Sequence, residues 1–255
     1  VHKILNTEIQ YNGKLYSLDM DNGVDLSIKN DFSGKGPIFY SSDWPKLEYA
    51  RSSDFLGDIR KGGSCNVPIV SLNIHCTGTH TESSAHISEN EKDIPEVCPK
   101  GLIPAYLVSV SPKNANNTKE LYHCKLSHEL VITAESLKEK LFDSFLALIV
   151  RTIPNDSSKI YRNYDRQPAP FFTNNAIDYI IELGIEHLLV DTPSIDKADD
   201  GGLLGNHRRF FKQGKTISEL LYIPNSIPDG LGFLQIQIPN WRLDAAPSRP
   251  IFYAT

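Results

Sequence analysis

The chain has 255 residues, of which 40% are hydrophobic and 22% are charged, as in ordinary folded proteins. Its net charge of -5, without a basic stripe interleaved with aromatic residues, argues against a nucleic-acid partner. No apolar run approaches the roughly 20 residues that span a bilayer, so no membrane partner is expected either.

The sequence predicts a single domain over residues 1–255, because no linker, repeat or low-complexity tract divides it. The four cysteines lack paired spacing, which favours reduced thiols over a disulfide framework. The first residues lack an apolar segment of signal-peptide length. We therefore expect a cytoplasmic protein.

The first part of the chain is predicted to be rich in strands. Residues 14–18 and 24–28 alternate in polarity and are separated by Asp21-Asn22-Gly23, a turn signal. Glycine, proline, serine and aromatic residues between Gly34 and Gly63 predict an ordered but irregular loop. Residues 67–74 predict a strand that leads directly into a group of histidines.

Three of the eight histidines lie within residues 75–86, together with Cys76 and Glu82. Glycine and small hydroxyl residues separate them, and such a permissive backbone can direct several side chains to one point. In an extended segment, His80 and Glu82 at i and i+2 share a face. Imidazole and carboxylate are common metal ligands, so the pattern predicts a metal site, although local clusters also arise by chance.

The second half of the chain is predicted to alternate helices and strands. We expect strands at residues 102–110, 145–151 and 187–191, the second of them buried on both faces. Thr133 is the expected N-cap of one helix, and a second helix is expected from Thr173 to Leu183. This alternation indicates an α/β layer set against a β-rich first half.

Two further candidate ligands, His207 and Glu219, lie far downstream. Taken alone, His207 is more often a surface or hydrogen-bonded histidine than a ligand. Glu219 interrupts an apolar patch, and a carboxylate there usually has a partner, which Arg208 or Arg242 would also provide. The other histidines have no partner at informative spacing and are interpreted as surface or strand residues: His2, His123, His128 and His187.

Taken together, the two groups resemble the cyclase or kynurenine-formamidase-like metal-dependent hydrolases. That family carries His-x-Gly-Thr-His-x-Asp-x-x-x-His, followed far downstream by a histidine and, twelve residues later, a glutamate. Residues 78–82 and His86 match the first motif, and His207 with Glu219 has the second spacing. Segments 24–27, 36–39, 190–196 and 244–250 are also similar, so the resemblance covers nearly the whole chain.

The resemblance implies an α/β fold of the swivelling β/β/α type with a mixed sheet, usually in a homo-oligomer (dimer or tetramer). It also implies one or two divalent metal ions, zinc first and manganese as the alternative. By position, His80 and His207 would bind metal, and Glu82 and Glu219 would bind or bridge. His86 would be the proton donor and acceptor rather than a ligand.

The first ligand is ambiguous because the family's histidine falls on Cys76, whereas the chain has His75 one place earlier. In a regular strand Cys76 shares the face of His80 and Glu82, which favours a thiolate ligand and zinc. A one-residue bulge would restore His75 instead. The imidazole and carboxylate ligands usual in the family favour His75, and both alternatives stay open.

Further departures concern the bridging residue and the substrate. Glu82 replaces the family's aspartate and is one methylene longer. Phe39 stands where the formamidases have a tryptophan that lines the substrate pocket, so it is the candidate substrate-binding residue. With Tyr40 and Trp44 it could form an aromatic wall for a flat substrate, or simply pack the loop onto the sheet.

The implied activity is hydrolysis of a small non-peptide amide, either an N-formyl arylamine or a cyclic amide (lactam), by a metal-dependent amidohydrolase. A divalent ion polarises a carbonyl and lowers the pKa of water, and a histidine can carry the proton to the leaving nitrogen. The alternative is a catalytically inactive scaffold of the same fold that binds metal or a small molecule, which the departures at Cys76 and Glu82 motivate. A zinc peptidase is not expected, because no His-Glu-x-x-His motif occurs.

Overall fold

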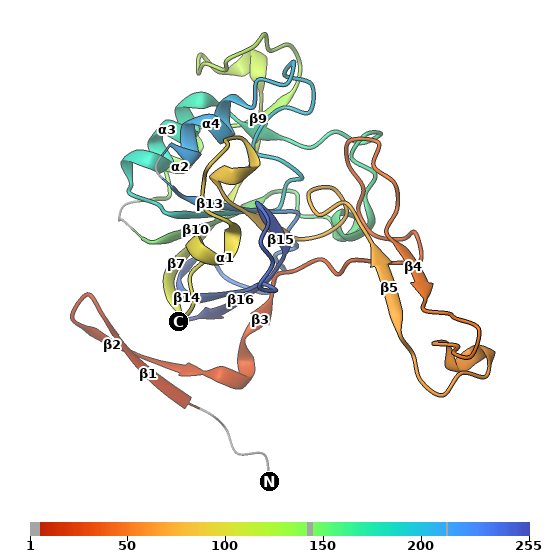
Figure 1. The fold of residues 1–255 in the computed structure, drawn as a ribbon. Helices are drawn as coiled ribbons and strands as arrows, with labels where there is room; N and C mark the ends of the chain where they lie inside the picture. Colours follow the sequence, from red (N-terminus) through yellow and green to blue (C-terminus); the bar gives the residue numbers. More distant parts are fainter. Residues whose placement is uncertain (1–5, 142–144, 213) are drawn as a thin grey trace.

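The computed structural model describes residues 6–141, 145–212 and 214–255, and a mixed nine-stranded sheet dominates them (Figure 1). Its strand order is β15-β6-β13-β12-β10-β7-β14-β16-β3. In that order the strands span Ala245–Pro247, His80–Glu82, Thr216–Glu219, His187–Val190, Ala147–Thr152, Ile103–Val110, Gly230–Gln237, Arg249–Ala254 and Val24–Asp25. Both halves of the chain contribute strands, and the predicted α/β class with a mixed sheet is confirmed.

The centre of this sheet is parallel and buried on both faces. β10 pairs in parallel with β7 and β12, and β12 pairs in parallel with β13. All six residues of β10 are buried, as its continuous apolar run predicted. Leu148 and Val150 pack into one core, and Ala147 and Ile149 pack into the core on the opposite face. Each large aliphatic side chain buried in this way contributes about 1.5–3 kcal/mol, so the central strands form a rigid platform.

Helices cover both faces of the platform (Figure 1). α2 (Ala134–Lys138), α3 (Asn174–Glu182) and α4 (Gly205–Phe211) pack on one face, and the short α1 (Ile94–Val97) packs on the other. Thr133 is an N-cap as predicted, and Thr173, which was expected to begin the second helix, caps it instead: their hydroxyl groups accept hydrogen bonds from the amides of Ser136 and Ala176. Each such cap contributes about 1 kcal/mol.

Smaller sheets and turns complete the described chain. β1 (Asn6–Tyr11) pairs with β2 (Lys14–Asp19), and β9 (Leu130–Ile132) lies between β8 (Lys113–Asn114) and β11 (Phe171–Phe172). Five 3-10 turns span Met20–Asn22, Ile59–Lys61, Ser84–His86, Ala115–Asn117 and Ser157–Tyr161. None of the helices in these ranges has the length and apolar character that crossing a bilayer requires.

The first part of the chain departs from its predicted elements. The irregular loop expected at residues 34–63 contains β4 (Lys46–Tyr49), which pairs with β5 (Pro68–Ser71) in a separate hairpin. The strand expected at 67–74 ends at Ser71 and does not lead directly into the histidines. Asn73 ends it, because its side chain accepts from the His75 amide and its carbonyl accepts from Cys76 and Thr77. These bonds form a turn of the kind that asparagine favours.

The histidines outside the two motifs take different positions. His187 begins β12 and is buried, and His128 is exposed in a loop. Both agree with their interpretation as strand and surface residues. His2 lies outside the described residues, and His123 belongs to a cluster described below.

Candidate metal centre

The upstream motif and Glu219 meet because β6 pairs antiparallel with β13. The register places His80 opposite Glu219 and Glu82 opposite Ile217. His80 and Glu82 lie two residues apart on β6, so they share a face, as the i, i+2 spacing predicted. The His80 Nε2 and Glu219 Oε2 atoms are 3.6 Å apart, and all three side chains are buried.

α4 adds His207 to the same point. Its Nε2 lies 3.0 Å from Glu82 Oε1 and 3.5 Å from Glu219 Oε1. Asp196 fixes the start of α4 by accepting from the amides of Asn206 and His207. The two distant sequence motifs therefore converge on one buried space.

Neither arginine considered as a partner of Glu219 takes that role. Arg208 donates to the carbonyl of Leu203, and Arg242 lies 3.8 Å from Asp93. Glu219 Oε1 instead accepts from the amide of Ile195. Its side chain is thereby held facing the histidines.

Hydrogen bonds on Nδ1 set the orientation of two imidazoles. His80 Nδ1 donates to the carbonyl of Gly78 at 3.1 Å, which leaves its Nε2 lone pair free. His207 Nδ1 lies 2.8 Å from Asp196 Oδ2, so the neutral ring also presents its Nε2 lone pair to the carboxylates. A carboxylate or carbonyl behind the imidazole is the usual arrangement around a ligating histidine.

Gly78 leaves room for the side chain of Asn30. A Cβ at this position would lie 2.5 Å from Asn30 Oδ1, so a larger residue would require the Asn30 side chain to move.

His75 completes the group, and Cys76 does not join it. His75 Nδ1 lies 3.1 Å from Glu82 Oε2, and its Nε2 lies 3.0 Å from Asp244 Oδ2. Cys76 packs in a separate apolar cluster with Phe39, and burial together with the nearby Glu219 raises the pKa of its thiol to about 12. Residues 74–78 form a turn, neither the regular strand nor the bulge considered from the sequence. This geometry favours His75 over Cys76.

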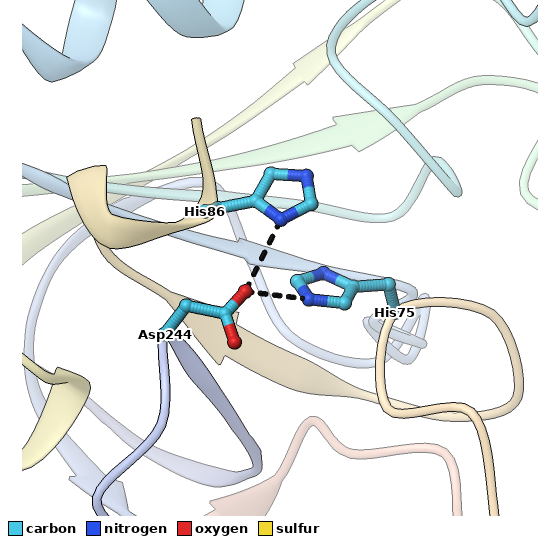
Figure 2. A group of neighbouring side chains, drawn as sticks. All are labelled: His75, His86 and Asp244. Atoms are coloured by element: carbon cyan, nitrogen blue, oxygen red, sulfur yellow. Dashed lines mark hydrogen bonds and ion pairs between the residues drawn. The ribbon is translucent and has the colours of Figure 1, made fainter. Parts of the chain in front are cut away.

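His86 lies beside His75 on the same carboxylate (Figure 2). Its Nδ1 is 3.2 Å from Asp244 Oδ2, its Nε2 is 3.8 Å from Glu82 Oε2, and its ring stacks on that of His75 with centroids 4.1 Å apart. Hydrogen bonds from the two histidines lower the pKa of Asp244. Sequence reasoning did not single out this aspartate. The only signal was its place at the head of the similar segment 244–250.

The position of Asp244 follows from strand pairing at the sheet edge. β15 begins at the next residue and pairs with β6, opposite Glu82, and the Asp244 carbonyl accepts from the Ser83 amide. The backbone of the motif strand therefore holds this carboxylate in place.

The charges around His207 explain its protonation without a metal. Burial would lower its pKa, but the negative charge of Glu82 and the contacts with the Asp196 and Glu219 carboxylates raise it well above the ordinary value. Burial likewise opposes protonation of His75, but its hydrogen bond to Asp244 and the negative charge of Glu82 raise its pKa to about 10. In the metal-free protein, protons thus compensate the buried carboxylates.

The donor atoms fit a divalent cation. His75, His80 and Glu82 form one group of ligand atoms within 4.8 Å of one another, and Glu82, His207 and Glu219 form another. Glu82 belongs to both, with Oε2 towards His75 and Oε1 towards His207. His80 Nε2 and both Glu82 oxygens are buried without a hydrogen-bond partner among the described residues. Such orphaned atoms are costly unless a cation satisfies them, and nitrogen with carboxylate oxygen suits zinc or manganese.

Comparison with known proteins agrees with this arrangement. The sequence model of the family described as "Putative cyclase" matches residues 24–197, more than half of the chain. The chain belongs to the cyclase family. A kynurenine formamidase of Bacillus mycoides (strain KBAB4) is 24% identical over 234 residues, covering 89% of this chain and 95% of that protein.

Solved structures share the fold of this cyclase-family chain. A predicted metal-dependent hydrolase from Bacillus stearothermophilus superposes with a TM-score of 0.62 and 16% identity, covering 92% of this chain and 98% of that one. Isatin hydrolase A from Ralstonia solanacearum superposes with a TM-score of 0.66 and 16% identity, covering 92% of each chain.

A cavity of about 510 Å³ adjoins the metal-ligand candidates of this cyclase-family chain. Phe39 lines it and is itself buried, and Asp196, the partner of His207, forms part of its wall. Its other apolar lining residues are Leu130, Tyr164, Pro168, Ala169, Pro170, Phe171, Pro193 and Ala198. Of the other two aromatic candidates, Tyr40 donates to the Ala198 carbonyl at the rim, and Trp44 lies in the β4–β5 hairpin region outside this lining.

A second histidine–carboxylate group, His123 with Asp196 and Asp200, lies behind α4. The carboxylate oxygens of this group already accept hydrogen bonds from the protein. Asp200 accepts from the amides of residues 202, 203 and 204, and Asp196 accepts from the Tyr122 hydroxyl as well as from α4. His123 Nε2 lies 3.0 Å from Asp200. This group holds the loop before α4 in place, whereas the sequence had been interpreted to place His123 at the surface or in a strand.

Proposed function

We propose that this protein is a metal-dependent amidohydrolase that cleaves a C–N bond in a small non-peptide amide. The observation that carries the proposal is the orientation of the Nε2 atoms of His80 and His207, which face Glu82 and Glu219 across 3.0 to 3.6 Å. A buried arrangement of this kind is unfavourable without a cation and is typical of a metal centre. We further propose that the fold is of the swivelling β/β/α type.

The proposed ligands are His75, His80, Glu82, His207 and Glu219, with Glu82 shared between two positions because its oxygens face different histidines. We propose zinc as the metal and manganese as the alternative, in one or two ions. When bound, such an ion polarises a carbonyl and lowers the pKa of water.

His86 is proposed as the acid and base. Its Nδ1 is held by Asp244, so its Nε2 points towards Glu82, at the edge of the ligand group. From there it can take a proton from water and return it to the leaving nitrogen. Its partial exposure gives it access to solvent, which the ligands His80 and His207 lack.

The proposed substrate is flat and mostly apolar, because the cavity beside the centre is walled by Phe39, Tyr164 and prolines. The related kynurenine formamidases and isatin hydrolases are named for an open-chain formamide and a cyclic amide. Both types present a carbonyl next to an aromatic ring. We therefore propose an N-formyl arylamine or a cyclic arylamide as the substrate class.

The test is hydrolysis by protein loaded with zinc or manganese against a panel of N-formyl arylamines, isatins, simple lactams and esters. Metal content is measured by mass spectrometry, and anomalous scattering locates the ion. We expect turnover of at least one aryl amide, together with an ion bound between His80 and His207. The matched control is protein stripped by chelation and reloaded with magnesium.

Two outcomes would contradict the proposal in different ways. An ion located away from His80 and His207 would contradict the proposed metal centre. Stoichiometric metal at His80 and His207 without cleavage of any amide would favour the non-catalytic scaffold, for which Glu82 in place of the family's aspartate is the motivating difference.

A further inference from the structure

The cavity beside the metal-ligand candidates is larger than one aromatic ring requires. Its volume is about 510 Å³, more than three times the roughly 150 Å³ of a closed apolar cavity that holds a single benzene molecule. A simple N-formyl arylamine or cyclic arylamide contains little more than one ring and its amide. With its carbonyl at the metal centre, such a molecule would fill only a part of the cavity. The remaining volume has room for a further group of the substrate.

The cavity has a buried part and a partly exposed part. Phe39 and Tyr164 are buried in its wall, and Asp196 connects this part to the metal-ligand candidate His207. Leu130, in contrast, is 49% exposed although it lines the same cavity. No hydrophobic cluster of the described residues includes Leu130. A ligand that covers this apolar surface removes it from water, which favours binding.

Charged side chains in the partly exposed part neutralise each other. Lys197 Nζ lies 2.7 Å from Glu129 Oε1, and the two side chains come from segments far apart in the sequence. Glu129 Oε2 also accepts from the amide of Ser127, and Lys197 donates to the carbonyl of Lys125. An ionic group of a ligand would have to compete with these partners. Asp199 adds a negative charge at the exposed rim, which disfavours an anionic group.

We propose that the substrate carries an uncharged apolar group on its aryl amide, and that Leu130 and the apolar segment 168–171 bind this group. The aryl amide then occupies the buried part beside Phe39, and the added alkyl or aryl group covers Leu130. This inference rests on the proposed function, because it places the amide carbonyl at the metal centre. It narrows the substrate class to aryl amides with an uncharged apolar extension.

The first test measures binding of para-alkyl acetanilides, from unsubstituted to butyl, to the full chain by calorimetry, with and without zinc. We expect the association constant to rise about fourfold for each added methylene, because each one removes apolar surface from water. An acetanilide of the same length that ends in a carboxylate should bind no better than the unsubstituted probe. An association constant that does not depend on chain length would overturn the proposal, and so would a preference for the carboxylate probe.

Two variants test where the added group binds. Leu130→Asp places a charge in the partly exposed part, so the association constant of the butyl probe relative to the unsubstituted one should fall about tenfold. Leu121→Asp, at a site that is 70% exposed and outside the cavity lining, is the matched control and should keep the wild-type ratio. Equal ratios in the two aspartate variants would overturn the assignment to Leu130.

Glu129→Gln tests the role of the ion pair. The substitution leaves Lys197 without its charged partner, so the carboxylate probe should bind about fivefold more tightly than it binds to wild type. An unchanged association constant would contradict the conclusion that the pair makes this part of the cavity select uncharged groups.

These outcomes are distinct from a failure of the proposed hydrolysis. Binding that strengthens with chain length, without cleavage of any amide, would support the assigned binding site and contradict the proposed function. Equal kcat/KM values for N-formylaniline and its para-butyl analogue would confirm hydrolysis and overturn the proposed extension of the substrate.

Discussion

Two histidine–carboxylate groups lie on either side of Asp196, and they differ in whether their nitrogen and oxygen atoms have hydrogen-bond partners. In the group around His80, Nε2 and both oxygens of Glu82 have no hydrogen-bond partner among the described residues. In the group around His123, the carboxylate of Asp200 is occupied by three backbone amides. Both bring ligand types within 4.8 Å, so proximity alone does not separate them. The unpaired atoms of His80 and Glu82 are available to bind a cation, whereas the hydrogen-bonded carboxylate of Asp200 stabilises the loop before α4.

The largest expected effect is that of Glu82→Gln. The amide cannot supply the shared charge that faces both His75 and His207, so we expect bound metal to fall to background and turnover to fall by more than about 100-fold. Metal analysis and the amide assay measure both. Glu89→Gln, at an exposed position on the same segment, should leave both at the wild-type level. Full metal content in the Glu82 variant would contradict the conclusion that the unpaired oxygens of Glu82 bind the ion.

His86→Ala tests the proton carrier separately from the ligands. We expect turnover to fall by about 10²- to 10⁴-fold while the metal content is unchanged, because His86 belongs to neither of the two groups of ligand atoms that contain Glu82, although it forms a third group with His75 and Asp244. Lys14→Ala, at an exposed position on β2 outside the cavity lining, is the control. An unimpaired His86 variant would exclude it from the reaction, whereas loss of metal would make it a ligand.

Asp244→Asn tests whether the carboxylate that joins His75 and His86 orients them. The amide keeps the shape but loses one charge-assisted acceptor, and we expect kcat to fall by about 10- to 100-fold with metal content retained. The kcat and KM values should separate, with KM nearly unchanged. Asp178→Asn, which removes a surface pair with Arg209, is the control. Unchanged kcat would show that the histidines need no carboxylate.

Metal binding should release protons at pH 7. The pKa values of His75 and His207 are raised in the metal-free protein, that of His75 to about 10, so both rings are protonated and must lose a proton to coordinate. Affinity should therefore rise by about tenfold per pH unit for each proton released. Calorimetry in buffers with different ionisation heats counts the protons. A count of zero would mean that these rings do not coordinate.

The raised histidine pKa values affect the stability of the metal-free fold in the opposite direction: stability falls as the pH rises, whereas metal affinity increases. A raised histidine pKa stabilises the folded state below the unfolded value near 6.5, and this contribution is lost as the pH rises through about 10. Thermal unfolding of chelated protein between pH 6 and 10 should show a falling Tm. Addition of metal should reverse much of that fall.

The smallest effect on metal binding is expected for Asp200→Asn. Three amides in the loop before α4 would lose their charged acceptor, so we expect a loss of about 1–3 kcal/mol in stability and no change in metal stoichiometry. Denaturant unfolding and metal analysis report the two quantities. A drop of one metal per chain would show that the His123 group also binds an ion.

The sequence predicted those features of the site that depend on local geometry. His80 and Glu82 share a face because an extended strand has a two-residue period, and Thr133 caps its helix through its own side chain. The resemblance also paired His207 and Glu219 with the upstream motif. The contact itself depends on the antiparallel register of β6 and β13, which no local pattern encodes.

The features that were not predicted depend on long-range packing or on single side chains. Asp244 reaches the site only because β15 pairs with β6, and its own sequence neighbourhood carries no ligand pattern. The strand expected to lead into the histidines stops because Asn73 bonds to the residues after it. The strand itself pairs with β4, which lies in a segment whose composition had indicated an irregular loop.

The place of β6 between β13 and β15 has a consequence for the order in which the protein matures. Thr81 and Ser218 join across 137 positions of sequence, and residues beyond Leu243 close the other edge of the same strand. During synthesis the histidine motif leaves the ribosome long before either neighbour exists. A nascent chain therefore exposes these ligands to the cellular milieu without the geometry to retain an ion, and selective loading must wait until His207 and Glu219 have emerged.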